Sequence, residues 1–185
     1  VAPDAVELKE DAVLPRSNAA VWRRRLLFLM MLIASTQAAK AESCPEGVDS
    51  QLNDLYAWHV AAPDRDTFLS QQQRFTPFLY GRISRAFDLS PARDGRFVDL
   101  DIFSGTQVAT FGADVLACYP SGGSTVDVIV AVRTGLRGQE SDVPQILRYR
   151  MIKDSTDNWR ISNIVWDAIH SESHSLNRFL DRLLP

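Results

Sequence analysis

Apolar residues recur at three- and four-residue steps in three stretches of the chain, which is the spacing of one face of a helix. The stretches run over residues 49–62, 66–89 and 173–184. Leu52, Leu55 and Tyr56 carry the first pattern. We expect Pro63 to end that helix, because proline disfavours helical geometry in the residue before it. Pro77 lies inside the second stretch and is expected to break or kink it.

In the second half of the chain the pattern changes to alternation, which is the period of a half-buried strand. Strands are predicted over residues 114–119, 125–134, 145–153 and 159–167, and residues 98–102 form a shorter strand or an extended loop. The runs 120–123 and 154–158 have turn composition. Helices followed by hairpin-linked strands predict an α+β fold, with N-terminal helices packed on a curved antiparallel sheet and a short C-terminal helix.

The order of these elements resembles the nuclear-transport-factor-2-like, or cystatin-like, α+β roll. The last predicted strand carries Asn158-Trp159-Arg160-Ile161-Ser162-Asn163-Ile164, which is similar to the recurrent final strand of such domains. Residues 99–107 and 175–180 resemble segments of a bacterial exported family of uncharacterised domains, some periplasmic and some lipoproteins. The resemblance covers roughly residues 52–184 and implies the fold, without implying an established activity.

A short apolar run near the start of the chain predicts a secretory signal peptide. Arg23-Arg24-Arg25 precede the apolar run 26–34, and Ala39 and Ala41 are small residues at the positions that a signal peptidase recognises. Cleavage would fall between Ala41 and Glu42. The run is too short for a transmembrane helix, which needs ~20 apolar residues.

Cleavage at that point divides the chain into a leader, 1–41, and a single α+β domain, 42–185. The part of the leader before the signal is expected to be disordered. The domain is expected in the periplasm as a soluble protein with no membrane span. An uncleaved signal, or a lipid on Cys44, would instead anchor it to the membrane.

Without the leader, the chain has 14 Lys and Arg residues against 19 Asp and Glu, a net charge of −5. An acidic domain without a Lys/Arg cluster is a poor fit to nucleic acid or to anionic membrane surfaces.

Cys44 and Cys118 form an even pair in an exported chain, which predicts a disulfide worth ~4 kcal/mol. The alternative is two free, buried thiols. No metal site is expected, because the cysteines are far apart and lack a nearby histidine pair.

Asp99 and Asp101 are the sharpest candidates for chemistry. Two carboxylates that are two residues apart on a strand share one face, and their repulsion raises one pKa, which suits acid–base work or a cation site. The alternative places both on a solvent face, opposite Val98 and Leu100. Gln107 follows them and would either orient a ligand or stabilise the loop.

Aromatic and histidine residues give the remaining candidates for a pocket or a partner-binding surface. Trp58 and His59 lie near the apolar stripe of the first helix, and His59 would either face a pocket or be a boundary residue bonded within the fold. Trp159 and Trp166 are predicted on opposite faces of the last strand. One of them should pack in the core, and Trp166 is the candidate to line a cavity or contact a partner.

Three arginines, Arg148, Arg150 and Arg160, are expected along one sheet face, where they would pair with Asp99 and Asp101 or meet an acidic partner. No serine or cysteine has a recognisable catalytic support. The residues therefore predict a non-enzymatic binding or interaction module for a protein or small ligand of the cell envelope, with no cofactor. The alternatives are a small-molecule isomerase or hydrolase with an acid–base pocket, and an envelope structural or assembly protein that dimerises through its sheet face.

Overall fold

The computed structural model describes residues 43–61, 65–91, 95–166 and 174–184. These residues belong to one compact unit, Ala41–Pro185. Within them, no helix is long and apolar enough to cross a membrane. The leader and the predicted cleavage site lie outside the described residues, so export stays a prediction.

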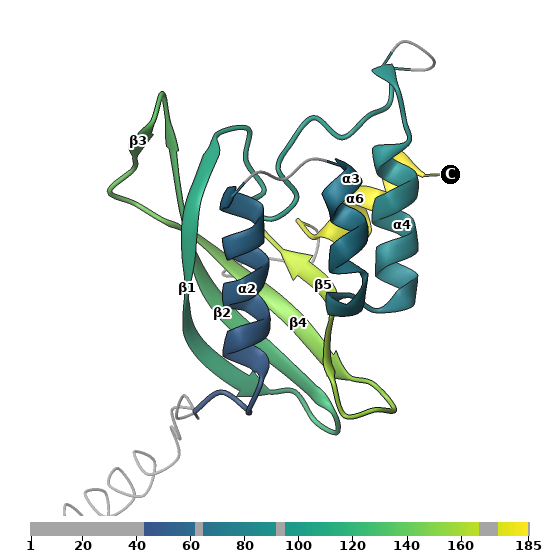
Figure 1. Cartoon of the computed structure of the whole chain (residues 1–185), viewed down its shortest axis with the longest axis vertical. Helices are drawn as coiled ribbons and strands as arrows, with labels where there is room; N and C mark the ends of the chain where they lie inside the picture. The colour runs from purple at the N-terminus through teal and green to yellow at the C-terminus, as the bar shows by residue number, and fades with distance from the viewer. Residues whose placement is uncertain (1–42, 62–64, 92–94, 167–173, 185) are drawn as a thin grey trace, which may run out of the picture. The chain divides into compact units, whose positions relative to one another are not determined.

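The described part of the chain folds as helices followed by strands and a final helix. The elements are α2 (Val48–Ala61), α3 (Arg65–Phe68), η1 (Leu69–Arg74), α4 (Pro77–Phe87), β1 (Ala109–Pro120), β2 (Thr125–Leu136), β3 (Gln139–Glu140), β4 (Gln145–Lys153), β5 (Trp159–Val165) and α6 (Leu176–Leu183). This is the predicted α+β class. Figure 1 shows the helices gathered on one face of the sheet.

The sheet is antiparallel throughout, with the strand order β1-β2-β4-β5, and β3 pairs with the far end of β2. β2 has partners on both sides, and its alternate residues Val126, Val128, Val130 and Val132 are almost fully buried. Because successive side chains point to opposite faces, these four valines line the face that the helices cover. The core therefore lies between the helices and this face of the sheet.

Helix boundaries follow from local chemistry. Thr76 caps α4, its hydroxyl accepting a hydrogen bond from the Leu79 N–H at 3.3 Å, and Pro77 occupies the first turn, where its missing N–H costs nothing. The predicted break at Pro77 is confirmed, because α3 and η1 end before it. α2 ends at Ala61, two residues before Pro63.

The first strand and the segment before it differ from simple alternation. β1 starts at Ala109, five residues before the predicted start, and the register shift between Thr110 and Gly112 interrupts the period of two in this missed part. Residues 98–99 have no regular secondary structure and Leu100 lies in a bend, so the predicted strand over 98–102 does not form. β3 was not predicted, since two exposed residues carry no periodic signal.

Candidate functional site

Asp101 organises the turn between the helical half and the sheet. Its backbone N–H donates to the Thr106 carbonyl at 2.8 Å, and its own carbonyl accepts from Gly105 N–H at 2.7 Å. Its side-chain Oδ1 accepts from the Phe103 N–H at 2.9 Å. The alternative that Asp101 lies on a solvent face is therefore wrong, because the turn directs its carboxylate inward.

His59 reaches this carboxylate from the last turn of α2. Its Nε2 lies 2.9 Å from Asp101 Oδ2, and the two side chains are only 12% and 17% exposed. The hydroxyls of Ser104 and Thr110 donate to the same oxygen at 2.8 Å each. Asp101 thus accepts four hydrogen bonds, from α2, from its own turn and from β1.

The charge state of Asp101 follows from this environment. Burial alone would raise the pKa of the carboxyl, but the hydrogen bond and charge of His59 and the donors of Phe103 and Thr110 hold it below its ordinary value. The carboxylate is therefore ionised at neutral pH, so Nε2 of His59 carries the proton that they share. The other ring nitrogen, Nδ1, is buried and has no hydrogen-bond partner among the described residues.

Two buried tyrosines, Tyr56 and Tyr149, hold the turn in place through hydrogen bonds. The Tyr56 hydroxyl donates to the Phe103 carbonyl at 2.7 Å and lies 2.7 Å from the hydroxyl of Tyr149 on β4. Burial raises the pKa of both phenols above the ordinary value, and their mutual contact adds to the shift for Tyr56. Both stay neutral donors, so the turn is fixed to α2 and to the centre of the sheet.

Trp166 closes the turn on its other side. Its indole Nε1 donates to the Ile102 carbonyl at 2.9 Å. Gly105 has φ +69°, and a Cβ placed there would lie 2.5 Å from Cγ of Trp166. A glycine is thus required both by the left-handed backbone and by the ring against it. Trp166 lies just beyond the end of β5, whereas Trp159 on β5 is 7% exposed and packs in the core.

A groove lies between α2, from Asn53 to Ala61, and the start of β1, and we call it the α2–β1 groove. It consists of two adjoining hollows of about 330 and 320 Å³ that share Val60. The first is lined by Asn53, Tyr56, Ala57, Val60, Ala61, Phe111, Gly112, Ala113 and Arg133, and the second by His59, Val60, Asp101, Val108, Ala109 and Thr110. The His59–Asp101 pair therefore borders the second hollow.

Arg133 on β2 lies at the end of the groove away from Asp101. Its guanidinium lies over Gly112, where a Cβ would approach Nη2 to 2.3 Å. It forms long ion pairs with Asp114 at 3.6 Å and with Glu140 at 3.4 Å. The atom that faces Asp114 is the buried Nε, which makes this ion pair but no hydrogen bond within the described residues.

Four of the predicted candidates, Trp58, Asp99, Gln107 and Trp166, do not line the groove. Asp99 is exposed and does not form a paired-carboxylate site with the inward-facing Asp101. Gln107 is also exposed. Trp58 packs its ring 6.1 Å from that of His59 and donates from Nε1 to the Thr67 hydroxyl at 3.2 Å, so it supports the histidine from behind.

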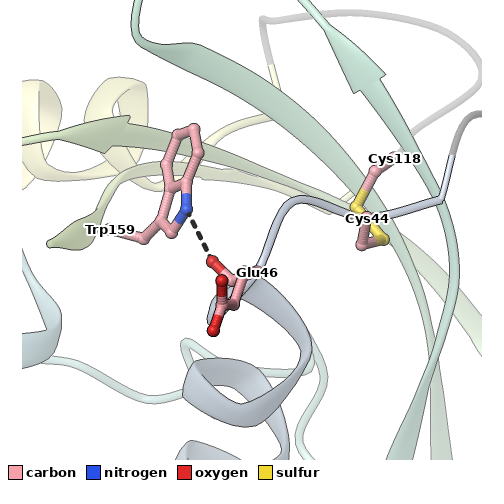
Figure 2. The surroundings of a disulfide bond; sticks show 4 residues. All are labelled: Cys44, Glu46, Cys118 and Trp159. Carbon is pink, nitrogen blue, oxygen red and sulfur yellow. Dashed lines mark hydrogen bonds between the residues drawn. A yellow bond between two sulfur atoms is a disulfide. The ribbon is translucent and has the colours of Figure 1, made fainter. Parts of the chain in front are cut away.

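The predicted disulfide is confirmed. Cys44 and Cys118 are bonded at 2.05 Å, which ties the segment before α2 to β1 across a sequence separation of 74 (Figure 2). Nearby, Trp159 Nε1 donates to the Glu46 carbonyl at 3.1 Å. Cys44, Asp49 and Cys118 are the one described cluster with metal-ligating atoms close together, but the disulfide occupies both sulfurs.

A third hollow, of about 350 Å³, lies beside this disulfide and is bordered by Trp159. Its cations already have partners. Lys153 lies 2.7 Å from Asp157, and Arg74 donates to Gln71 Oε1 at 2.7 Å. We therefore regard this hollow as an irregularity of the surface and not as a ligand-binding site.

The arginines predicted on one sheet face find carboxylates other than those expected. Arg150 pairs with Asp127 at 2.9 Å across the β2–β4 ladder. Arg160 pairs with Asp154, in the turn before its own strand, at 2.5 Å. The predicted pairing of Arg150 and Arg160 with Asp99 and Asp101 was therefore wrong. The register of the strands decides which residues are cross-strand neighbours, and the pattern of apolar and polar residues does not give the register.

Sequence reasoning missed Thr110, Ser104 and Arg133 as site residues. Each becomes a neighbour of the groove only through tertiary folding. The alternation of β2 could have placed Arg133 on its polar face, but not beside Gly112.

No protein-family model, curated protein or solved structure matches this chain.

Proposed function

We propose that this protein is an exported, periplasmic binding module whose ligand site is the α2–β1 groove. The observation that carries the proposal is that Asp101 is already saturated by four protein donors while it borders an accessible hollow. Such a carboxylate holds the wall of a site in place. It has little capacity left to take up a proton during a reaction.

The composition of the groove supports binding of a small, largely apolar ligand. Its apolar lining residues include Ala57, Val60, Phe111 and Ala113, and polar groups lie at its two ends. Binding sites for small molecules commonly combine an apolar lining with a small number of fixed polar groups. Val60 is 46% exposed, although it is an aliphatic residue in the middle of the groove.

The disulfide and the antiparallel sheet with helices on one face support the further parts of the proposal. A disulfide between cysteines 74 positions apart suits an oxidising compartment such as the periplasm. We also propose that the domain is a cystatin-like roll of the exported family that its sequence resembles. The strand order and the helices on a single face support that assignment.

A neutral, apolar dye tests the binding site. N-phenyl-1-naphthylamine fluoresces strongly only when it leaves water, so binding to the purified protein should give a saturable signal with one site per chain. Val60→Asp should abolish the signal. The matched control is Leu69→Asp, which changes a 67% exposed apolar residue on η1 and should retain it. Equal signals from both variants would contradict the proposed site.

Acid–base catalysis is a second candidate, which the 2.9 Å contact of His59 and Asp101 favours. An aspartate that holds Nε2–H leaves Nδ1 as the basic nitrogen, and this is the reverse of the usual triad orientation. A catalytic histidine would hydrolyse p-nitrophenyl acetate faster than free imidazole does, and His59→Gln would remove the excess. We expect no excess, because Nδ1 is buried.

A further inference from the structure

We infer that the α2–β1 groove receives the tip of the β2–β3 hairpin from a second copy of this chain, so that two chains form a closed dimer. We call residues 136–143 the hairpin tip. A partner chain in the groove goes beyond the proposed function, because it depends only on the shape and charge of the groove and would compete with a small ligand. The evidence is an uncovered apolar residue on the tip, its position beside the groove, and the charges of both.

The row of β2 residues that packs under the helices continues into the hairpin tip. Four buried valines begin this row, and Thr134, next in the alternation, is also buried. Leu136 follows on the same face but is 65% exposed. Val143, on the returning arm, is exposed as well, and Figure 1 shows this hairpin projecting beyond the helices. Uncovered aliphatic side chains on a projecting element are typical of a protein-contact site.

The turn and the strand pairing hold the hairpin tip in one conformation. Arg137 and Gly138 have φ values of +53° and +78°, as in the two-residue turn that suits twisted antiparallel strands. Beyond the turn, the Ser141 N–H donates to the Thr134 carbonyl at 2.8 Å. Leu136 is therefore presented on a preorganised element, which lowers the entropy cost of docking.

The hairpin tip begins beside the groove. Arg133 lines the first hollow. Two residues further along β2, Gly135 pairs with Ala109 on one side and with Glu140 on the other. Ala109 lines the second hollow, so the tip starts one residue beyond the wall of the groove. Because tip and groove adjoin, a twofold axis beside them would place each tip over the groove of the other chain and close the pair.

The groove offers an apolar surface to Leu136. Val60 is exposed in the middle of the groove, and Phe111 and Ala113 also line the first hollow. This hollow, of about 330 Å³, is larger than a leucine side chain. Contact between Leu136 and Val60 in both halves of the dimer would remove four exposed aliphatic side chains from water, which favours association.

The charges of the tip and of the groove are complementary. At the Arg133 end of the groove, Asp114 and Glu140 face a single guanidinium, so one negative charge is not balanced. The side chain of Asp114 is 67% exposed. Arg137, at the tip, makes no side-chain hydrogen bond or ion pair within the described residues. Arg137 of one chain would thus meet Asp114 of the other at the edge of the contact, where opposite charges favour this pairing over others.

Sedimentation equilibrium of the purified protein tests the pairing. We expect a monomer–dimer equilibrium with no larger species, because a closed pair leaves no free tip. Leu136→Asp should weaken the dimer by about tenfold or more, whereas Leu69→Asp, which changes an equally exposed leucine on η1, should leave it unchanged. Arg137→Glu should also weaken the dimer, and adding Asp114→Lys should restore it, because the reversed charges attract each other again.

Failure of the pairing is distinguishable from failure of the proposed function, because Leu136→Asp should still bind N-phenyl-1-naphthylamine. A wild type that stays monomeric at every concentration would overturn the inference, and saturable dye binding would keep the proposed function. A dimer that persists in Leu136→Asp, or one that Val60→Asp leaves intact, would place the interface outside the tip or the groove and would also overturn it. Loss of the dimer in both variants, without dye binding to the wild type, would support the pairing and remove the small-ligand proposal.

Discussion

Nε2 of His59 and Oδ2 of Asp101 lie 2.9 Å apart and join the last turn of α2 to the turn before the sheet across 42 positions of sequence. The contact fixes one wall of the α2–β1 groove. Because Asp101 also binds Ser104 and Thr110, the same carboxylate connects three parts of the fold. Its loss should therefore affect stability as well as the shape of the site.

Asp101→Asn should lower the free energy of unfolding by about 3 kcal/mol, because it removes charge-assisted hydrogen bonds and turns an amide N–H₂ toward existing donors. Urea denaturation measures the change. Asp99→Asn removes an equal charge two residues away at an exposed position and should stay within about 0.5 kcal/mol of the wild type. Similar losses in the two variants would contradict the role given to Asp101.

Stability should fall in acid because the pKa values of Asp101 and Asp127 are lowered in the folded state. A carboxyl with a lowered folded pKa contributes stability that is complete above the unfolded value of about 3.9 and is lost as the pH falls through the folded value. The urea midpoint should thus decline below about pH 4. Asp101→Asn should flatten that decline, and an unchanged slope would count against the assignment.

The Cys44–Cys118 disulfide closes a long loop, so reduction should destabilise the protein by about 4 kcal/mol in the chain-entropy model. Thermal melting with and without dithiothreitol measures this effect. The double variant Cys44→Ala, Cys118→Ala should melt near the reduced wild type and should not respond to the reductant. If reduction leaves the melting temperature of the wild type unchanged, the staple does not contribute to stability.

Gly105→Ala should destabilise the protein by about 3 kcal/mol, because the new Cβ meets the Trp166 ring as well as an unfavourable backbone conformation. Gly122→Ala separates the two effects. Its φ is +90°, but nothing lies within 4 Å of an added Cβ, so it should cost only about 1 kcal/mol. Equal costs would mean that the ring moves aside freely.

Much of the fold was predictable, since period and turn chemistry are local properties of the chain. β4 matches its alternating pattern from Gln145 to Lys153 residue for residue, and Pro77 marks the start of α4. β1 was predicted too short because the register shift between Thr110 and Gly112 interrupts the alternation in its first half.

The candidate site was predictable only in part. His59 and Asp101 were identified individually, from a helical stripe and from an acidic segment. Their contact depends on the turn that reverses the chain at residues 101–106, and the pattern of residues 98–102 indicated an extended segment instead. Arg133 was missed because it reaches the groove only by lying over Gly112 on the neighbouring strand. The two residues are neighbours through the strand register, which the sequence pattern does not give.

The central claim is that the α2–β1 groove is the binding site, and an amide chemical-shift map of the protein titrated with octanamide tests it most directly. We expect the largest changes to cluster at residues 57–61 and 111–113, on both walls of the groove. The largest changes around Glu46 and Trp159, or changes spread evenly over the chain, would contradict it.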